Sequence, residues 1–346
     1  MTSVNSDLEE MVADLFANKV THADVIEAER VALLDSLWAT VAELDLGSVG
    51  IPEESGGAGG TFVDIATILF AAGQHAAPLP LLDNYLARRV ATSAGVDVRG
   101  AQHWSIAPGT PKDSLVYANG QVSGTVHAVA WGGSAARVVA YVDGQIVVLD
   151  PTLATVTHAR DIAGQPSDTL TFDGVAAQIH ETPFGVEALR IEGGLLRAAQ
   201  MAGAMEAIAE LSRVYASQRV QFGKPIGSFQ AVQTHLVYLA EAATLLRVSV
   251  ERAAALVAEE KDASFASGAA KLLANQYAAI SIKSGHQVHG AIGMTQEYSL
   301  QDYTRRLNAW RADWGSEFEV ADRLGAAVAS VPVLARVAID EGAVIA

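Results

Sequence analysis

The stretch Arg213–Gln233 reads RVYASQRVQFGKPIGSFQAVQ and governs how the rest of the chain is interpreted. An alanine-rich run over residues 198–216 leads into it, and a second long helical run follows. Glycine and proline between the runs end one helix and set the next at an angle, which predicts a helix–turn–helix. Taken alone, this pattern is that of a plain turn with a buried Phe222. The turn also fixes Arg219, whose planar guanidinium can bind a phosphate.

Length and composition bound the class of protein. The chain has 346 residues, of which half are apolar and 18% charged, so it can hold two or three modules with ample core. The net charge of −16 and the lack of a basic block argue against nucleic acid or an anionic membrane as a partner. There are no cysteines, which excludes disulfides and thiolate metal sites. The first ten residues, MTSVNSDLEE, are unlike a signal peptide and no apolar run is long enough to span a bilayer, so a cytoplasmic location is expected.

The patterning divides the chain into three expected domains. Residues 1–100 are expected to form an all-α domain interrupted by a glycine-rich loop at residues 50–60. Apolar residues recur at helical spacing in four runs of this part, residues 8–15, 31–41, 62–73 and 81–94. Residues 101–185 consist instead of short Val, Ile and Thr runs broken by glycine. Asn119-Gly120 and Asp143-Gly144 there predict type I′ hairpins, and so a small middle β-barrel or sandwich.

Helical patterning returns in residues 186–346, which are expected to form a C-terminal four-helix bundle. The predicted helices cover residues 187–217, 228–260, 263–290 and 316–340. In the second of them, one apolar stripe consists of Leu239, Ala243, Leu246, Val250, Ala254 and Val257. Such a stripe is typical of a helix that packs inside a bundle.

Four motifs, in order, resemble those of the acyl-CoA dehydrogenase family. Arg219 to Gln230 resembles its RxxFGxPI-xxFQ motif, and residues 50–60 (GIPEESGGAGG) resemble its "vPEeyGGaG" loop. QVHGAIG at residues 287–293 is similar to its QxxGGxG turn, and TQEYSLQDYTR at residues 295–305 to the run that follows. The resemblance implies an α+β fold with an N-terminal all-α domain, a small middle β-barrel and a C-terminal four-helix bundle. It also implies FAD as the cofactor and an acyl-CoA substrate.

In this family a carboxylate removes the α-proton of an acyl thioester while FAD takes a hydride from Cβ. A neighbouring subunit's C-terminal helices hold part of the FAD pyrophosphate and adenosine. The residues that the resemblance assigns to this half of the cofactor are Arg219, Gln221, Phe222, Phe229, Gln230, Gln287, Gly290 and Gly293. Ala291, in place of the second glycine of QxxGG, is a mild departure from the family pattern.

The residues expected to hold the isoalloxazine match the family's motifs poorly. Residues 104–114 (WSIAPGTPKDS) lack both parts of the family's TEPxxGSD loop. Trp131 and Ser134 are weaker candidates for flavin contacts, and Trp131 fits a core position in the barrel equally well. Gly315 and Ser316 align with the end of the family's YEGT motif and are weak candidates too.

The usual catalytic base is missing. A count of nine residues from Arg305 places the family's base at Trp314, and an indole cannot accept a proton. A second base position used by a minority of the family falls on Gly193. Glu192 and Asp313 are adjacent to these two positions and are the weak candidates for a replacement. No metal site is expected, because the pair His286 and His289 has no third ligand nearby.

The chain keeps the residues for the adenosine half of FAD and lacks those for the isoalloxazine half and the base. In this it resembles the shorter, non-catalytic subunit of the actinobacterial heteromeric (α2β2) acyl-CoA dehydrogenases, known from steroid side-chain degradation. The resemblance implies a paralogous partner subunit that shares FAD with this chain and carries the base. A steroid side-chain CoA ester is then among the expected substrates. Two alternatives stay open. One is a self-sufficient homo-oligomeric dehydrogenase that uses Glu192 or Asp313, and the other is a flavin-free structural partner.

Overall fold

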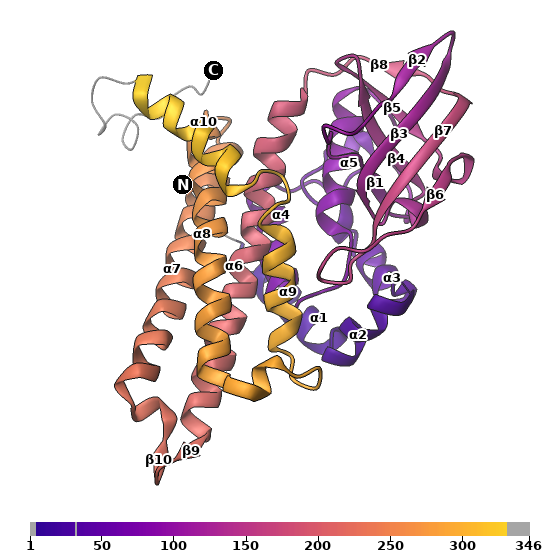
Figure 1. Ribbon diagram of the computed structural model, residues 1–346. Helices are drawn as coiled ribbons and strands as arrows, with labels where there is room; N and C mark the ends of the chain where they lie inside the picture. The colour runs from indigo at the N-terminus through magenta and orange to yellow at the C-terminus, as the bar shows by residue number, and fades with distance from the viewer. Residues whose placement is uncertain (1–4, 32, 331–346) are drawn as a thin grey trace. The chain divides into compact units, whose positions relative to one another are not determined.

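The computed structural model describes residues 5–31 and 33–330 (Figure 1). These residues group into two compact units. Unit 1 contains residues 5–22, 66–77 and 194–330, and unit 2 contains residues 23–65 and 78–193. The predicted order of N-terminal helices, a small sheet region and a C-terminal helical bundle is confirmed. The bounds of the three expected domains stay a prediction.

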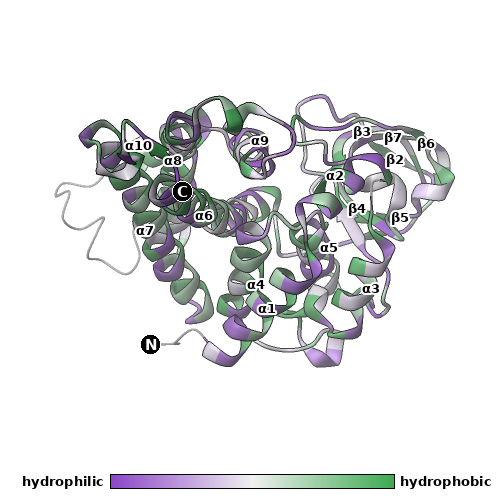
Figure 2. Ribbon diagram, turned by 90° about the horizontal axis from the view of Figure 1, so that it is seen from below, coloured by the Kyte–Doolittle hydropathy of each residue, from purple (hydrophilic) through white to green (hydrophobic). Residues whose placement is uncertain are grey.

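The bundle of unit 1 contains the helices expected from the sequence. They are α6 (Val186–Gln218, in unit 1 from Gly194), α7 (Gln230–Ala258), α8 (Ser264–His289) and α10 (Glu317–Ser330). Residues 331–340 of the last predicted helix lie outside the described part. The apolar stripe of α7 is buried from Leu239 to Ala254, and Figure 2 shows α6, α7 and α8 nearly end-on. A further helix, α9 (Leu300–Trp310), was not predicted as a helix from its TQEYSLQDYTR motif.

Unit 1 also contains α1 (Ser6–Lys19) and most of α4 (Phe62–Gln74), which crosses α6 at a pair of glycines. A Cβ atom on Gly203 would lie 2.0 Å from the Phe70 carbonyl oxygen, and one on Gly73 would lie 2.0 Å from the Gln200 carbonyl oxygen. Real Cβ atoms do not approach backbone oxygens so closely, so only glycine permits this crossing.

Unit 2 contains the helices α2 (His22–Val31, from Ala23), α3 (Asp35–Glu43) and α5 (Leu81–Ser93). The predicted helical run over residues 31–41 is wrong as a single helix. Helix α2 ends at Val31, and Leu34 is in an extended conformation just before α3 begins. The apolar spacing did not reveal this break, because the residues on both sides of it are hydrophobic.

The strands of unit 2 form two four-stranded sheets. One has the order β1 (Trp104–Ile106), β4 (Arg137–Val142), β5 (Gln145–Leu149) and β8 (Ile179–His180). The other has the order β2 (Val116–Ala118), β3 (Gln121–Ala130), β7 (Ser167–Ala176) and β6 (Thr155–Thr157). Only β1 and β4 pair in parallel among these strands of the described chain. Valines, alanines, leucines and Phe172 from both sheets form one buried core.

Both predicted hairpins of the sheets are confirmed. Asn119 and Gly120 have φ values of 52° and 76°, and they join β2 to β3. Asp143 and Gly144 have φ values of 49° and 80°, and they join β4 to β5. Two consecutive positive φ angles are what a type I′ turn requires, and Asn-Gly and Asp-Gly tolerate them best.

Candidate functional site

The connection between α6 and α7 is a β-hairpin, not the plain helix–turn–helix predicted from its glycine and proline. Strands β9 (Val220–Gln221) and β10 (Lys224–Pro225) pair in antiparallel fashion. Phe222 and Gly223 form the turn with φ values of 51° and 80°. The left-handed conformation of two successive residues favours a hairpin over a simple helix end. Figure 1 shows this hairpin beyond the ends of α6 and α7.

The hairpin presents an aromatic side chain and a cation to solvent. Phe222 is 91% exposed, which contradicts the expected buried position, and its ring meets the edge of Phe229 at 6.1 Å. The Lys224 ammonium lies 4.5 Å from the centre of the Phe229 ring. Arg219 is exposed, and no other residue of the described part bonds to its guanidinium. A large exposed aromatic and an exposed guanidinium on the same hairpin are typical of a surface that binds a partner or an anion.

The second predicted segment lies at the same end of unit 1. Gln287 is exposed in the last turn of α8, and Gly290 follows it with a φ of 62°. A Cβ atom on Gly293 would lie 2.9 Å from the His289 Cβ, so the 3₁₀ turn η6 (Gly290–Met294) folds back tightly onto α8. Tyr215, in the last turn of α6, stacks on His289 at 4.7 Å. The structure thus brings the two predicted segments together through this contact.

The loop between α9 and α10 contains the position expected for the base. Trp314 is only 8% exposed and has a φ of 57°, and Gly315 follows with a φ of 125°. The weak candidate Asp313 forms an ion pair with Arg197 at 3.3 Å, and the Arg197 side chain is 7% exposed. The weak candidate Ser316 caps α10, since its amide and hydroxyl both donate to a carboxylate oxygen of Glu319. None of these groups is a free carboxylate.

Two buried side chains of α8 clamp this loop, and sequence reasoning missed both. The Lys271 ammonium donates to the Trp310 carbonyl oxygen at 2.7 Å and to Asn275 at 2.9 Å. Asn275 in turn donates to the Gly315 carbonyl oxygen at 3.1 Å. Burial lowers the pKa of Lys271 to about 7. The signal was available, because both residues fall on the alanine-rich buried face of α8.

The other weak base candidate, Glu192, lies in unit 2. Its carboxylate is 3.1 Å from Arg89 Nε, and the Tyr85 hydroxyl also bonds to it. Burial raises the pKa of Glu192, and the charge of Arg89 opposes that effect. The positive charge of Arg89 stabilises the carboxylate and so opposes its protonation. This arrangement is typical of a structural ion pair more than of a general base.

The residues expected near a flavin ring use their polar groups within unit 2. In the loop of residues 104–114, the Thr110 amide and hydroxyl both donate to Asp113. Asp113 also accepts from the His127 amide at 2.9 Å. Trp131 is 4% exposed, and the Ser134 hydroxyl donates to the Trp131 carbonyl oxygen at 3.2 Å. Donors satisfied by such local contacts are not available to pin a ligand.

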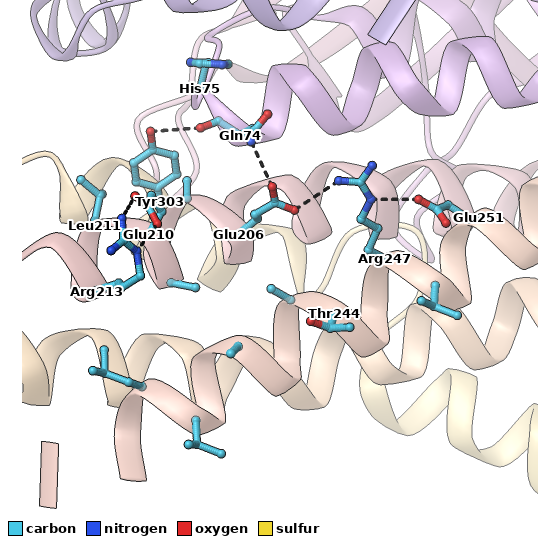
Figure 3. Close-up of a pocket in the computed structure, with 17 residues that line it drawn as sticks. Gln74, His75, Glu206, Glu210, Leu211, Arg213, Thr244, Arg247, Glu251 and Tyr303 are labelled. Atoms are coloured by element: carbon cyan, nitrogen blue, oxygen red, sulfur yellow. Dashed lines mark hydrogen bonds and ion pairs between the residues drawn. The ribbon is translucent and has the colours of Figure 1, made fainter. Parts of the chain in front are cut away.

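A groove of about 980 Å³ runs between α6 and α7 in unit 1 (Figure 3). Arg247 lies in it and bonds to Glu9, Glu206 and Glu251. Arg213 pairs with Glu210 in the same groove. None of the site residues predicted from the sequence lines it. Since carboxylates already hold both arginines, the groove offers poor charge complementarity to an anion such as coenzyme A.

Within residues 5–31 and 33–330, no three His, Asp or Glu side chains lie close enough together to hold a metal ion. None of the helices in the described part is long and apolar enough to cross a membrane.

Two family models match the chain. Residues 2–88 match the acyl-CoA dehydrogenase N-terminal domain, and residues 192–317 match the acyl-CoA dehydrogenase C-terminal domain. The chain belongs to the acyl-CoA dehydrogenase family. The second match contains the Arg219 hairpin, the Gln287 turn and the Trp314 loop.

Among curated members of the family, acyl-CoA dehydrogenase IpdE2 of Mycobacterium tuberculosis is 29% identical over 306 residues. That alignment covers 86% of this chain and 88% of the relative. The solved ChsE4–ChsE5 complex from Mycobacterium tuberculosis gives a TM-score of 0.85 at 21% identity, with 96% of this chain and 99% of that chain covered. A variant of the Tcur3481-Tcur3483 steroid acyl-CoA dehydrogenase gives a TM-score of 0.85 at 22% identity, with 94% and 97% covered. These two likenesses show the fold.

Members of the acyl-CoA dehydrogenase family generally bind FAD, and the two halves of the expected site fit this cofactor differently. The guanidinium of Arg219, which bonds to no residue within the described ranges, and the exposed amide of Gln287 fit the phosphates and the adenosine. Thr110 is engaged by Asp113, and Trp131 is buried in unit 2, so neither is available to an isoalloxazine ring. The residues present therefore fit one half of the cofactor.

Proposed function

We propose that this chain is the subunit of a heteromeric acyl-CoA dehydrogenase that completes the FAD site of a paralogous partner and lacks the catalytic base. One contrast carries the proposal. The hairpin with Arg219 and Phe222 is presented to solvent, while Trp314 is buried at the base position. A group that serves another subunit has to be exposed in the isolated chain, whereas a base has to be a free carboxylate.

In this proposal, the chain's own residues bind and orient. Arg219 contributes a planar cation to the phosphates, and Gln287 contributes a neutral hydrogen bond. Gln221, Phe229, Gln230, Gly290 and Gly293 are the other residues proposed to contact this half of the cofactor. Phe222 covers the site from the hairpin and excludes water. When bound, FAD would supply the hydride acceptor for Cβ of the acyl thioester, and a carboxylate of the partner would accept the α-proton, so that an α,β double bond would form.

The relatives support a partner and suggest a substrate class. One structure with the same fold is a ChsE4–ChsE5 complex, and another is named a steroid acyl-CoA dehydrogenase. We therefore propose an α2β2 assembly with a paralogous subunit and an acyl-CoA substrate of the steroid side-chain type.

The first test is the FAD content of the purified chain. Because residues 104–114 lack the family's TEPxxGSD loop and Thr110 there donates to Asp113, the chain alone should purify without stoichiometric FAD and with little yellow colour. The complex with the partner should contain FAD. Stoichiometric FAD in a pure homo-oligomer would refute the shared site and favour a self-sufficient enzyme, and a flavin-free complex would favour a structural partner.

The second test is Arg219→Ala in the complex. Loss of a charge-assisted hydrogen bond costs about 1.5–3 kcal/mol, so the affinity for FAD should fall roughly ten- to hundredfold. Arg252→Ala is the matched control, since Arg252 is also exposed but lies near the other end of α7. Equal affinities in both variants would contradict the role of Arg219. Gln287→Ala should act in the same direction and more weakly.

The third test concerns the base. Glu192→Gln and Asp313→Asn should leave the turnover of the complex within a few-fold, while removal of the partner's carboxylate should abolish it. General base catalysis contributes roughly 10²–10⁴-fold, so the two results are easily told apart. A loss of a hundredfold or more in Glu192→Gln, with folding and flavin content intact, would show that this chain carries its own base.

A further inference from the structure

Three aromatic rings meet at the end of unit 1 where the hairpin lies. Tyr215 and His289 stack with ring centres 4.7 Å apart and planes 28° from parallel. Tyr298 meets His289 at 5.0 Å and the edge of Tyr215 at 6.2 Å. His289 is 3% exposed, so its ring is enclosed by its neighbours. These three residues, which we call the aromatic cluster, belong to no role assigned above.

Hydrogen bonds fix the orientation of the His289 ring. Its Nδ1 lies 2.8 Å from the Gly285 carbonyl oxygen, which can only accept, so Nδ1 carries the proton. In the neutral ring Nε2 then accepts from the Tyr298 hydroxyl at 3.1 Å. Both ring nitrogens are thus engaged, which leaves no nitrogen of His289 for a metal.

Each ring is attached to a segment of the proposed FAD site. The Arg219 amide donates to the Tyr215 carbonyl oxygen at 2.9 Å, so Tyr215 lies one helical turn before the hairpin. His289 lies between Gln287 and Gly290 and is the surface against which η6 folds back. Tyr298 lies just before α9, in the segment after η6.

The hairpin cannot position itself. All residues from 217 to 225 are exposed, so the hairpin has no core of its own. Ala216, at 1% exposure, is the last fully buried residue of α6 before the hairpin, and Tyr215 is adjacent to Ala216. The position of Arg219 relative to Gln287 therefore depends on how the flanking helix ends pack, and Tyr215 is the side chain at the end of α6 that stacks on α8.

We propose that Tyr215, His289 and Tyr298 form a positioning unit that fixes the Arg219 hairpin and the Gln287 turn relative to each other, so that both contact one cofactor. The proposal rests on the proposed function. The cluster touches no reacting atom and acts only through the two segments that it joins. Its effect is on the affinity for FAD, and not on the chemistry.

The test uses two substitutions that keep the ring packing. Tyr298→Phe removes one hydroxyl, and His289→Phe removes both ring-nitrogen bonds while a ring remains to stack. In the complex with the partner, Tyr298→Phe should weaken FAD binding about two- to tenfold, which is the value of a neutral hydrogen bond. His289→Phe should weaken it at least as much. Flavin fluorescence measures this affinity without reference to turnover.

The matched control is Val250→Ala, a buried position roughly 30 Å along α7 from its first residue. This substitution lowers thermal stability by loss of packing but leaves the cluster intact. Even where Val250→Ala lowers Tm as much as the cluster variants do, it should leave the affinity for FAD unchanged. If Val250→Ala weakens FAD binding as much as Tyr298→Phe does, the effect is one of general stability and the proposal is overturned.

A second measurement needs neither FAD nor the partner. Limited trypsin digestion of the isolated chain reports the mobility of the hairpin through cleavage after Arg219. Both cluster variants should speed this cleavage severalfold, and Val250→Ala should not. Unchanged cleavage and unchanged FAD affinity would overturn the positioning role. If Arg219→Ala leaves FAD affinity unchanged, the proposed function fails, while the cleavage rates still decide whether the cluster positions the hairpin.

Discussion

Replacement of Lys271 by methionine tests the clamp on the loop that carries Trp314. The lysine is 1% exposed, and burial lowers its pKa from 10.5 to about 7. In the unfolded chain the same side chain recovers its ordinary pKa. Methionine has a similar length and no charge, so Lys271→Met removes the titration and leaves most of the packing.

Whether the free energy of unfolding rises or falls with pH depends on which state of the chain binds more protons. Between about pH 7 and pH 10.5 the unfolded chain binds one proton more at Lys271 than the folded chain, so the free energy of unfolding rises with pH. The slope is about 1.4 kcal/mol per pH unit, or about 3 kcal/mol over two units. Below about pH 7 both states are protonated, and the contribution no longer changes.

Urea unfolding followed by far-UV circular dichroism measures this difference across the alkaline range. The unfolding free energy of the wild type minus that of Lys271→Met should rise by about 3 kcal/mol over two pH units. Lys283→Met is the control, because Lys283 is exposed on the same helix and should give a constant difference. Parallel pH profiles for the wild type and Lys271→Met would refute a buried lysine that titrates near neutrality.

Three further predictions concern other parts of the chain. Burial lowers the pKa of His103 to about 4, so between pH 6.5 and pH 4 the unfolded chain binds one proton more than the folded chain. The free energy of unfolding should therefore fall by about 3 kcal/mol over this range. His103→Gln should abolish this fall when unfolding is measured across the acid range. Gly203→Ala should cost several kcal/mol in unit 1, measured as a loss of Tm, because its Cβ would meet the Phe70 carbonyl oxygen at 2.0 Å; a Tm equal to that of the wild type would contradict the close crossing. Phe222→Ser should change the free energy of unfolding by less than about 0.5 kcal/mol, since the ring is 91% exposed. It should nevertheless weaken assembly with the partner, measured by analytical ultracentrifugation. Unchanged assembly would show that the hairpin is not part of the interface.

Much of the fold was accessible from local patterns. Asn119-Gly120 and Asp143-Gly144 predicted their hairpins because a type I′ turn is a property of two residues. The helices of the bundle were predictable because the stripe from Leu239 to Ala254 repeats over many turns. The order of helical, β and helical parts followed from these signals.

The parts that were missed have either a weak local signal or contacts between residues far apart in the sequence. The hairpin at Phe222 was missed because Phe-Gly is a weak turn signal and the flanking helices dominate the pattern. Lys271 lies on the alanine-rich buried face of α8, but it was missed because a lysine is normally assigned to the surface, and its acceptor at Trp310 is known only once the helices are packed. The ion pairs of Glu192 and Asp313 likewise join residues far apart in the sequence.

The interleaving of the two units affects how the chain is made on the ribosome. Helix α1 belongs to unit 1, and Glu9 on it meets Arg247, 238 residues further along. At roughly 5–20 residues per second, about 10–50 s of translation separate the two. During that interval all of unit 2 emerges and can fold, while α1 and the end of α4 have no bundle to pack against. Early release of these helices as free amphipathic segments makes them natural binding sites for chaperones during synthesis.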